Sequence, residues 1–170
     1  MFELRPLSTT AIPAALAKAE RYRLLNEPSE AESICLDILA VDPAHQDALT
    51  MMLLAITDQF SGEGDAARAA RAEQILPEIH DEYARAYFGA LMKERRARAY
   101  FAHERLSLAH DWLVDALHGF DKAMALRPAG NDDAVLRWNA CVRLLHRIPG
   151  AVAGGRSHGR ANHVGVSRVR

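Results

Sequence analysis

The amino-acid sequence predicts an all-α fold built from short helices that pair into antiparallel hairpins. Residues 10–148 are rich in alanine, leucine, glutamate and arginine, which favour helix, and they show no alternating strand pattern. Proline and glycine breakers divide this stretch into segments of helical length. Two of the prolines, Pro43 and Pro77, lie 34 residues apart, which is a period typical of helical repeats.

The breakers separate four short helices in the first half of the chain. These helices are expected at residues 10–25, 28–41, 44–59 and 65–76. A final helix is expected at residues 132–147, because Asn131 can cap its start and His146 and Arg147 suit its negative end. The pair Pro149-Gly150 then ends it.

The region before Pro128 is longer than one repeat. Pro77 and Pro128 are 51 residues apart, 17 more than the 34-residue period. The surplus forms either an elongated hairpin that turns near Ser107 or one unbroken helix over residues 81–126, which would be ~69 Å long. We favour the hairpin, because serine often starts a helix and a lone helix would leave its apolar face uncovered.

Two segments share the same spacing of small and apolar residues before a closing proline. They are Ala116, Phe120, Ala123 and Pro128, and Ala31, Cys35, Ile38 and Pro43. The middle unit is degenerate: it has Asp65 in place of alanine but keeps Ala69, Ala72 and Pro77. On these residues the chain resembles the tetratricopeptide repeat over about residues 12–128. The resemblance implies stacked antiparallel hairpins, a short α-solenoid with one elongated hairpin, and a last helix that caps the stack.

The domain organisation is expected to be simple. We predict one helical domain at residues 10–148, between an N-terminal segment at 1–9 and a disordered basic tail at 149–170. The apolar run Met51–Ile56 is far shorter than the ~20 residues of a membrane span. The N-terminus lacks the pattern of a secretory signal, so we expect a cytoplasmic protein. The excess of arginine over lysine, together with abundant alanine, is typical of GC-rich genomes and suggests a bacterial source.

No motif for catalysis, cofactor binding or metal binding occurs. His103, His110 and His118 lack the i, i+4 spacing of helical zinc sites. The two cysteines, Cys35 and Cys141, cannot form a disulfide framework. The sequence contains neither a nucleophile motif nor a glycine-rich phosphate loop. We therefore expect a protein that is not an enzyme and that needs neither a cofactor nor a metal.

Two surfaces are candidates for binding a partner. The elongated hairpin gathers aromatic and cationic residues of the kinds enriched in protein interfaces: Lys93, Arg96, Tyr100, Phe101, Arg105 and Trp112. Alternatively, its aromatic residues only pack its two helices together.

The resemblance implies the second surface, a concave face that includes Leu16, Glu20 and Phe88. In related co-chaperones, a lysine and an asparagine at the positions that correspond to Leu16 and Glu20 clamp a terminal carboxylate. Leu16 and Glu20 argue against that ligand and favour an amphipathic helix or an extended peptide.

These observations predict a scaffold, adaptor or assembly factor that binds a helix or peptide segment of another protein. Two alternatives stay open: a secretion or assembly chaperone that masks an apolar client, and a nucleic-acid-associated protein that uses the basic tail. Residues 134–170 contain seven arginines and no acid. In residues 150–170, however, the arginines are widely spaced and no aromatic residue is present to stack on bases, which disfavours nucleic acid. The sequence does not indicate an oligomeric state.

Overall fold

The computed structural model describes residues 2–62 and 65–149, and within these residues it contains seven α-helices and no strand. The prediction of an all-α fold is therefore confirmed. The helices are α1 (Ile12–Leu24), α2 (Pro28–Val41), α3 (Gln46–Asp58), α4 (Ala66–Ile75), α5 (Glu82–Ala102), α6 (Leu106–Leu126) and α7 (Asp133–Leu145). None of these helices has the length and apolarity needed to cross a membrane. The predicted tail lies outside the described residues, except for Pro149.

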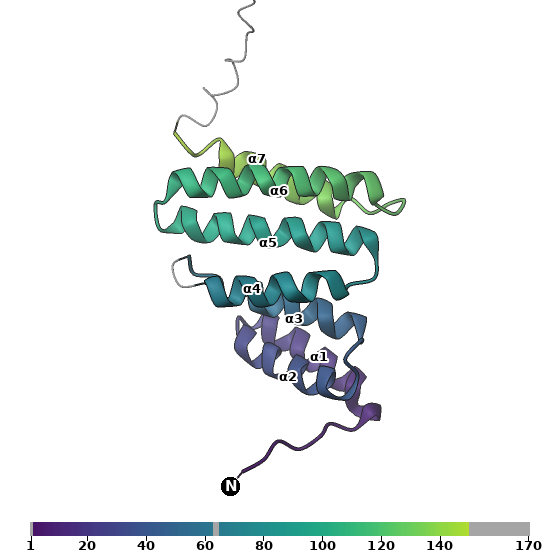
Figure 1. The fold of residues 1–170 in the computed structure, drawn as a ribbon. Helices are drawn as coiled ribbons and strands as arrows, with labels where there is room; N and C mark the ends of the chain where they lie inside the picture. Colours follow the sequence, from purple (N-terminus) through teal and green to yellow (C-terminus); the bar gives the residue numbers. More distant parts are fainter. Residues whose placement is uncertain (1, 63–64, 150–170) are drawn as a thin grey trace, which may run out of the picture.

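The helices pair in chain order and stack in layers (Figure 1). The pairs are α1 with α2, α3 with α4 and α5 with α6, and α7 packs on α6 at one end of the stack. Two short 3₁₀ turns, Thr9–Ala11 and Leu76–Glu78, precede α1 and follow α4. The expected stack of helical hairpins with a final helix is present.

Small buried residues allow the paired helices to approach closely. Ala19 on α1 and Ala31 on α2 are both fully buried, as their spacing predicts. In the elongated hairpin, Ala116, Phe120 and Ala123 are also fully buried. The pattern residues before the closing prolines therefore belong to the core.

The core consists of two main clusters. One lies among α5, α6 and α7 around Phe120 and Leu113, and the other joins the first four helices around Leu53 and Ile56. Phe88 on α5 packs against both clusters. The stack is therefore continuous, although its apolar contacts divide into two regions.

The elongated hairpin is confirmed, and the unbroken helix over residues 81–126 is excluded. The chain turns at residues 103–105, so Ser107 lies in the first turn of α6 and does not begin it. Glu104 adopts a left-handed conformation with φ of 57°, and the Arg105 N–H donates to the carbonyl oxygen of Tyr100 at 3.0 Å. The turn contains neither glycine nor proline, which explains why sequence breakers did not locate it.

Asp65, the residue that departs from the repeat pattern, organises the start of the α3–α4 connection. Its Oδ2 accepts hydrogen bonds from the backbone N–H groups of Ser61 at 2.5 Å and Gly62 at 2.6 Å. Gly62 has a φ of 103°, which glycine adopts without strain. Because Asp65 is itself only 4% exposed, the carboxylate is a structural part of this loop.

Capping explains where the later helices begin. Asp81 precedes α5, and its Oδ1 accepts the N–H of Ala84 at 2.6 Å. Asn131, which the sequence predicts as the cap of the last helix, lies one residue before the N-cap residue Asp132, and its Oδ1 accepts the N–H of Asp133 at 3.0 Å. The hydroxyl of Tyr83 donates to the same Asn131 oxygen at 3.1 Å, which ties the start of α7 to α5.

Candidate functional site

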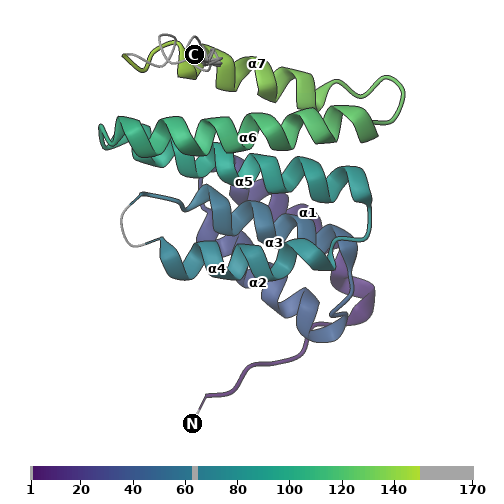
Figure 2. The same ribbon diagram turned by 45° about the horizontal axis from the view of Figure 1, so that its top comes forward.

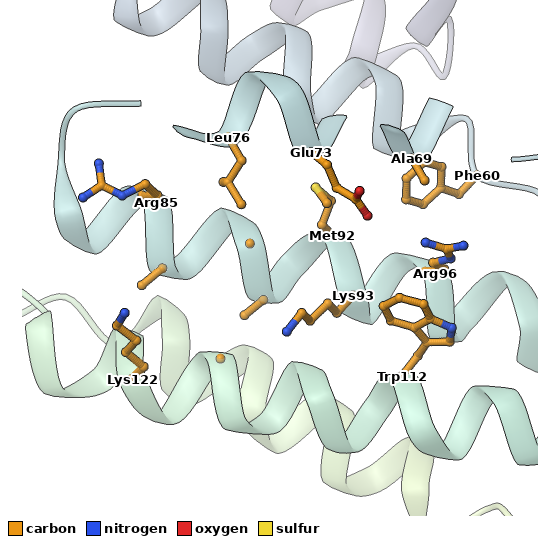
Figure 3. A pocket seen from close by; sticks show the side chains of 14 residues that line it. Phe60, Ala69, Glu73, Leu76, Arg85, Met92, Lys93, Arg96, Trp112 and Lys122 are labelled. Atoms are coloured by element: carbon orange, nitrogen blue, oxygen red, sulfur yellow. The ribbon is translucent and has the colours of Figure 1, made fainter. Parts of the chain in front are cut away.

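Helix α5 lies between α4 and α6 in the stack (Figure 2). A groove lies between α4 and the α5–α6 hairpin (Figure 3). We call it the α4–α6 groove, and its cavity volume is about 280 Å³. It is lined by Phe60, Ala69, Glu73, Leu76, Arg85, Ala86, Gly89, Ala90, Met92, Lys93, Arg96, Trp112, Gly119 and Lys122. Most of these side chains present carbon atoms to the cavity, so the surface of the groove is mainly apolar.

The groove exists because two neighbouring hairpins do not close on each other along their full length. The preceding hairpin junction is tight, since α2 packs closely on α3, whereas α4 makes little contact with α5. Helix α4 has 10 residues, while α5 and α6 have 21 each. The shorter helix therefore leaves part of the long hairpin uncovered.

The connection between α4 and α5 is tied to α3. The side-chain amide of Gln46 donates to the carbonyl oxygen of Glu78 at 3.2 Å, and its Oε1 accepts the N–H of His80 at 2.8 Å. Ile79 between them is 2% exposed and belongs to the core around α3. Because this connection is held against α3, α5 makes more contact with α3 than with α4. The space between α4 and α5 therefore stays open.

Small residues form the floor of the groove. Gly119 on α6 lies against Ala90 on α5, and a Cβ at Gly119 would be 2.8 Å from the Ala90 Cβ. Gly89 lies nearby and faces Leu76, whose Cδ2 would be 3.1 Å from an added Cβ. Neither glycine contributes a side chain to this part of the groove.

An aromatic and cationic pair lies at one end of the groove. The guanidinium of Arg96 lies 4.3 Å from the centre of the Trp112 ring (Figure 3). This distance is within the range of a cation–π interaction. Phe60 and Ala69 line the same end from the α3–α4 side. The Trp112 ring and the Arg96 guanidinium together form the wall at this end of the groove.

Cationic side chains outnumber acids around the groove. Four cationic residues, Arg85, Lys93, Arg96 and Lys122, face a single acid, Glu73. None of the four makes an ion pair with an acid within residues 2–62 and 65–149. Arg85 instead donates to the carbonyl oxygen of Ile79 at 2.6 Å, which orients its guanidinium without cancelling its charge. The groove therefore combines an apolar floor with a positive rim.

The structure brings three of the predicted hairpin residues together and separates the rest. Lys93, Arg96 and Trp112 line the α4–α6 groove. Tyr100 and Phe101 are partly buried against the α5–α7 core, as the alternative interpretation of the aromatic residues expected. The Arg147 guanidinium lies 5.1 Å from the Phe101 ring.

The remaining predicted residue, Arg105, is the N-cap residue of α6 in the turn. The neighbouring turn residue His103 packs against Gly62, whose added Cβ would be 2.9 Å from the His103 Cδ2. The end of the hairpin is therefore supported by the α3–α4 connection, and it does not project as an isolated arm.

The predicted concave-face residues occupy a different part of the molecule. Leu16 and Glu20 on α1 line a shallow, open depression together with Thr50 and Met51 on α3. Phe88 lies between the two core clusters, with its ring 5.2 Å from the ring of Tyr87 in an edge-to-face arrangement. The structure does not place Phe88 in the same depression as Leu16 and Glu20.

A row of ion pairs connects the hairpins. Asp58 on α3 accepts from Arg23 on α1 at 2.6 Å and from Arg95 on α5 at 2.7 Å. Arg95 also donates to the carbonyl oxygen of Leu54 at 3.0 Å. Burial lowers the pKa of Arg95 to about 10, against the opposing effect of nearby Asp58. These contacts cross-link three helices, which is a structural role.

A buried acid, Glu94, continues this row towards α7. Glu94 is fully buried, and its Oε1 lies 2.8 Å from the Arg98 guanidinium and 3.6 Å from that of Arg137. Its other oxygen, Oε2, has no hydrogen-bond partner among the described residues. The pair with Arg137 joins α5 to the capping helix α7.

Eleven of the groove residues were not predicted as site residues from the sequence. They are Phe60, Ala69, Glu73, Leu76, Arg85, Ala86, Gly89, Ala90, Met92, Gly119 and Lys122. The available signal was the glycine inside each long helix, because an isolated helical glycine usually has a packing or functional reason. No local sequence pattern identifies the other residues, because their place in the groove depends on how α4 packs relative to α5.

No family model, curated protein or solved structure matches this chain. The site must therefore be interpreted from its own geometry. Within the described residues, no group of three or more histidine, cysteine, aspartate or glutamate side chains is arranged to hold a metal ion.

Proposed function

We propose that this protein is a non-enzymatic adaptor that binds a helix or peptide segment of another protein through the α4–α6 groove. The proposal includes the assignment of its three hairpins to a degenerate tetratricopeptide-type repeat and a location in the bacterial cytoplasm. The observation that carries it is the apolar groove left between two hairpins, lined by Gly89 and Gly119 at its base and by Trp112 at one end.

The dimensions of the groove support a peptide ligand. Its lining extends along α5 from Arg85 to Arg96, which corresponds to about 17 Å at the rise of an α-helix. This length accommodates about three turns of a partner helix. A cavity of about 280 Å³ also has room for a large apolar side chain. Helix-in-groove binding uses this combination of a shallow track and an apolar anchor point.

The composition of the groove supports the same conclusion. Tryptophan and arginine are the residue types most often found at energetic centres of protein interfaces. Here Arg96 and Trp112 are already held against each other at 4.3 Å, so a partner needs to order little of this surface on binding. The proposal assigns no chemical step to the protein.

Affinity capture from an extract of the source cells tests the proposal. Gly89→Met places a long side chain in the groove, whereas Lys18→Glu changes an exposed residue of α1 outside it. We expect one partner to be recovered by the unmodified protein and by Lys18→Glu but not by Gly89→Met. Circular dichroism must first show that all three proteins are equally helical.

A partner that is still captured by Gly89→Met would contradict the groove as the binding site. Trp112→Ala is a second test, because it removes the wall of the groove without adding volume to the floor. We expect the affinity for the captured partner, measured by calorimetry, to fall at least about tenfold in this variant.

A further inference from the structure

We infer that the α4–α6 groove selects an acidic amphipathic helix, whose carboxylates meet the cationic rim while an apolar side chain enters the floor. This inference rests on the proposed function and specifies the chemistry of the partner. It is carried by the distribution of charge around the groove.

The positive rim contrasts with the rest of the helical body. The chain has a net charge of −1, and all 22 of its acids lie in residues 1–133, which also contain the groove. Yet the lining of the groove contains four cations and only Glu73 as an acid. Because none of those cations pairs with an acid of the described residues, their charge is available to a ligand.

All four cations lie on the α5–α6 side of the groove, whereas the α4 side carries the acid Glu73. Lys93 and Arg96 lie one turn apart on α5, and Lys122 projects from α6 (Figure 3). Arg85 lies on α5 about 12 Å from Lys93, towards the N-terminal end of the helix. A partner helix seated in the groove would match this arrangement with carboxylates on the flank of its apolar stripe that faces α5 and α6.

The apolar floor distinguishes a peptide from a nucleic acid. A phosphate backbone has no group to fill the cavity beside Gly89, Ala90 and Met92, whereas an amphipathic helix supplies leucine or an aromatic residue. One face of the Trp112 ring, on which a base could otherwise stack, is already covered by Arg96. The chain's own residues 150–170 contain four arginines and no acid, so their charge has the same sign as the rim.

A displayed library of random peptides of about 14 residues, panned against the full chain, tests the inference. The enriched peptides are expected to be acidic, with apolar residues at i, i+3 or i+4, and i+7. A synthetic peptide with the consensus of this pool is then titrated into a Trp138→Phe variant, in which Trp112 is the remaining tryptophan. Binding should shift the Trp112 emission to the blue as water leaves the groove.

Charge reversal provides the decisive comparison. The double variant Lys93→Glu, Lys122→Glu is expected to bind the acidic peptide at least about tenfold more weakly and to enrich basic peptides when panned again. The matched control Lys18→Glu, Arg143→Glu reverses two exposed charges outside the groove and should change the affinity less than about twofold. If the reversed variant is not folded, Lys93→Gln, Lys122→Gln replaces it, with a smaller expected loss.

The outcomes separate this inference from the proposed function. Neutral or basic peptides whose binding is abolished by Gly89→Met would overturn the acidic selectivity and leave the groove as a binding site. Peptides that bind Gly89→Met normally, or no enrichment at all, would overturn both. Tighter binding of a 20-nucleotide single-stranded or duplex DNA probe, lost on charge reversal, would assign the cationic rim to nucleic acid instead.

Discussion

Gly119 on α6 and Ala90 on α5 touch so closely that any side chain at Gly119 would collide with Ala90, because an added Cβ would lie only 2.8 Å away. The added Cβ would also lie 3.2 Å from the Ala90 Cα, and this backbone atom cannot rotate away as a flexible side chain could. This contact sets the separation of the two longest helices. It also forms part of the floor of the α4–α6 groove.

Gly119→Ala is expected to destabilise the protein by about 1–3 kcal/mol, because the overpacking outweighs the better helix propensity of alanine. The free energy of unfolding in urea measures the effect. Gly89→Ala is the matched control, since its added Cβ would meet only the flexible end of Leu76 at 3.1 Å. An equal loss of stability in both variants would contradict the close approach at Gly119.

Asp65→Ala is expected to lower the free energy of unfolding by about 1–3 kcal/mol, because the N–H groups of Ser61 and Gly62 would lose their acceptor. The same urea experiment measures it. Asp37→Ala removes an exposed acid of α2 and should change the stability by less than about 0.5 kcal/mol. Equal stability of the Asp65 and Asp37 variants would show that the carboxylate does not organise the loop.

Asp58→Asn should also destabilise the stack by about 1–3 kcal/mol. The change leaves Arg95 without its ion-pair partner in surroundings that already lower its pKa to about 10 by desolvation. The comparison is Asp111→Asn, whose carboxylate is 72% exposed beside His110 and should matter little. A neutral effect of Asp58→Asn on the unfolding free energy would contradict the cross-linking role.

The two buried thiols predict a loss of stability at high pH. Burial raises the pKa of Cys35 and of Cys141 to about 12, above the value near 9 of an exposed thiol. The folded state therefore favours the protonated thiols, and their contribution is complete below pH ~9 and declines as the pH rises from 9 towards 12. Each thiol is expected to account for about 2 kcal/mol of lost stability by pH ~10.5.

Urea unfolding at pH 8.5 and 10.5 tests this prediction against the variant Cys35→Ala, Cys141→Ala. The variant should lose less stability over this interval, because lysine and tyrosine titrate alike in both proteins. An identical pH dependence would contradict the raised pKa values. In the native protein at pH 8, both thiols should also react with maleimide far more slowly than after unfolding.

Local signals in the sequence were enough to locate most helices. The bounds predicted for the second helix are those of α2, Pro28–Val41, because proline starts it and Asp42-Pro43 ends it. The predicted pairing of the elongated hairpin was also correct, since only a partner helix could cover so long an apolar face. The turn was predicted near Ser107 but lies at residues 103–105. It was misplaced because Glu104 adopts the left-handed backbone conformation that a glycine usually marks in a sequence.

The candidate site depended on contacts that no local pattern contains. The groove arises because Gln46 holds residues 78 and 80, more than thirty positions later, against α3 and so separates α5 from α4. Likewise, the sequence pattern grouped Phe101 and Trp112 in one cluster. In the structure Arg147 lies over the Phe101 ring, whereas Trp112 lines the groove.

The sequence by itself determined the helices, their pairing and the residues that face the core, because these follow from breakers and from apolar spacing within one or two helices. The tertiary structure alone decided which surface stays open. Whether α4 closes on α5 depends on how separate hairpins pack together. That packing is set by side chains distant in sequence, such as Gln46 and Gly119.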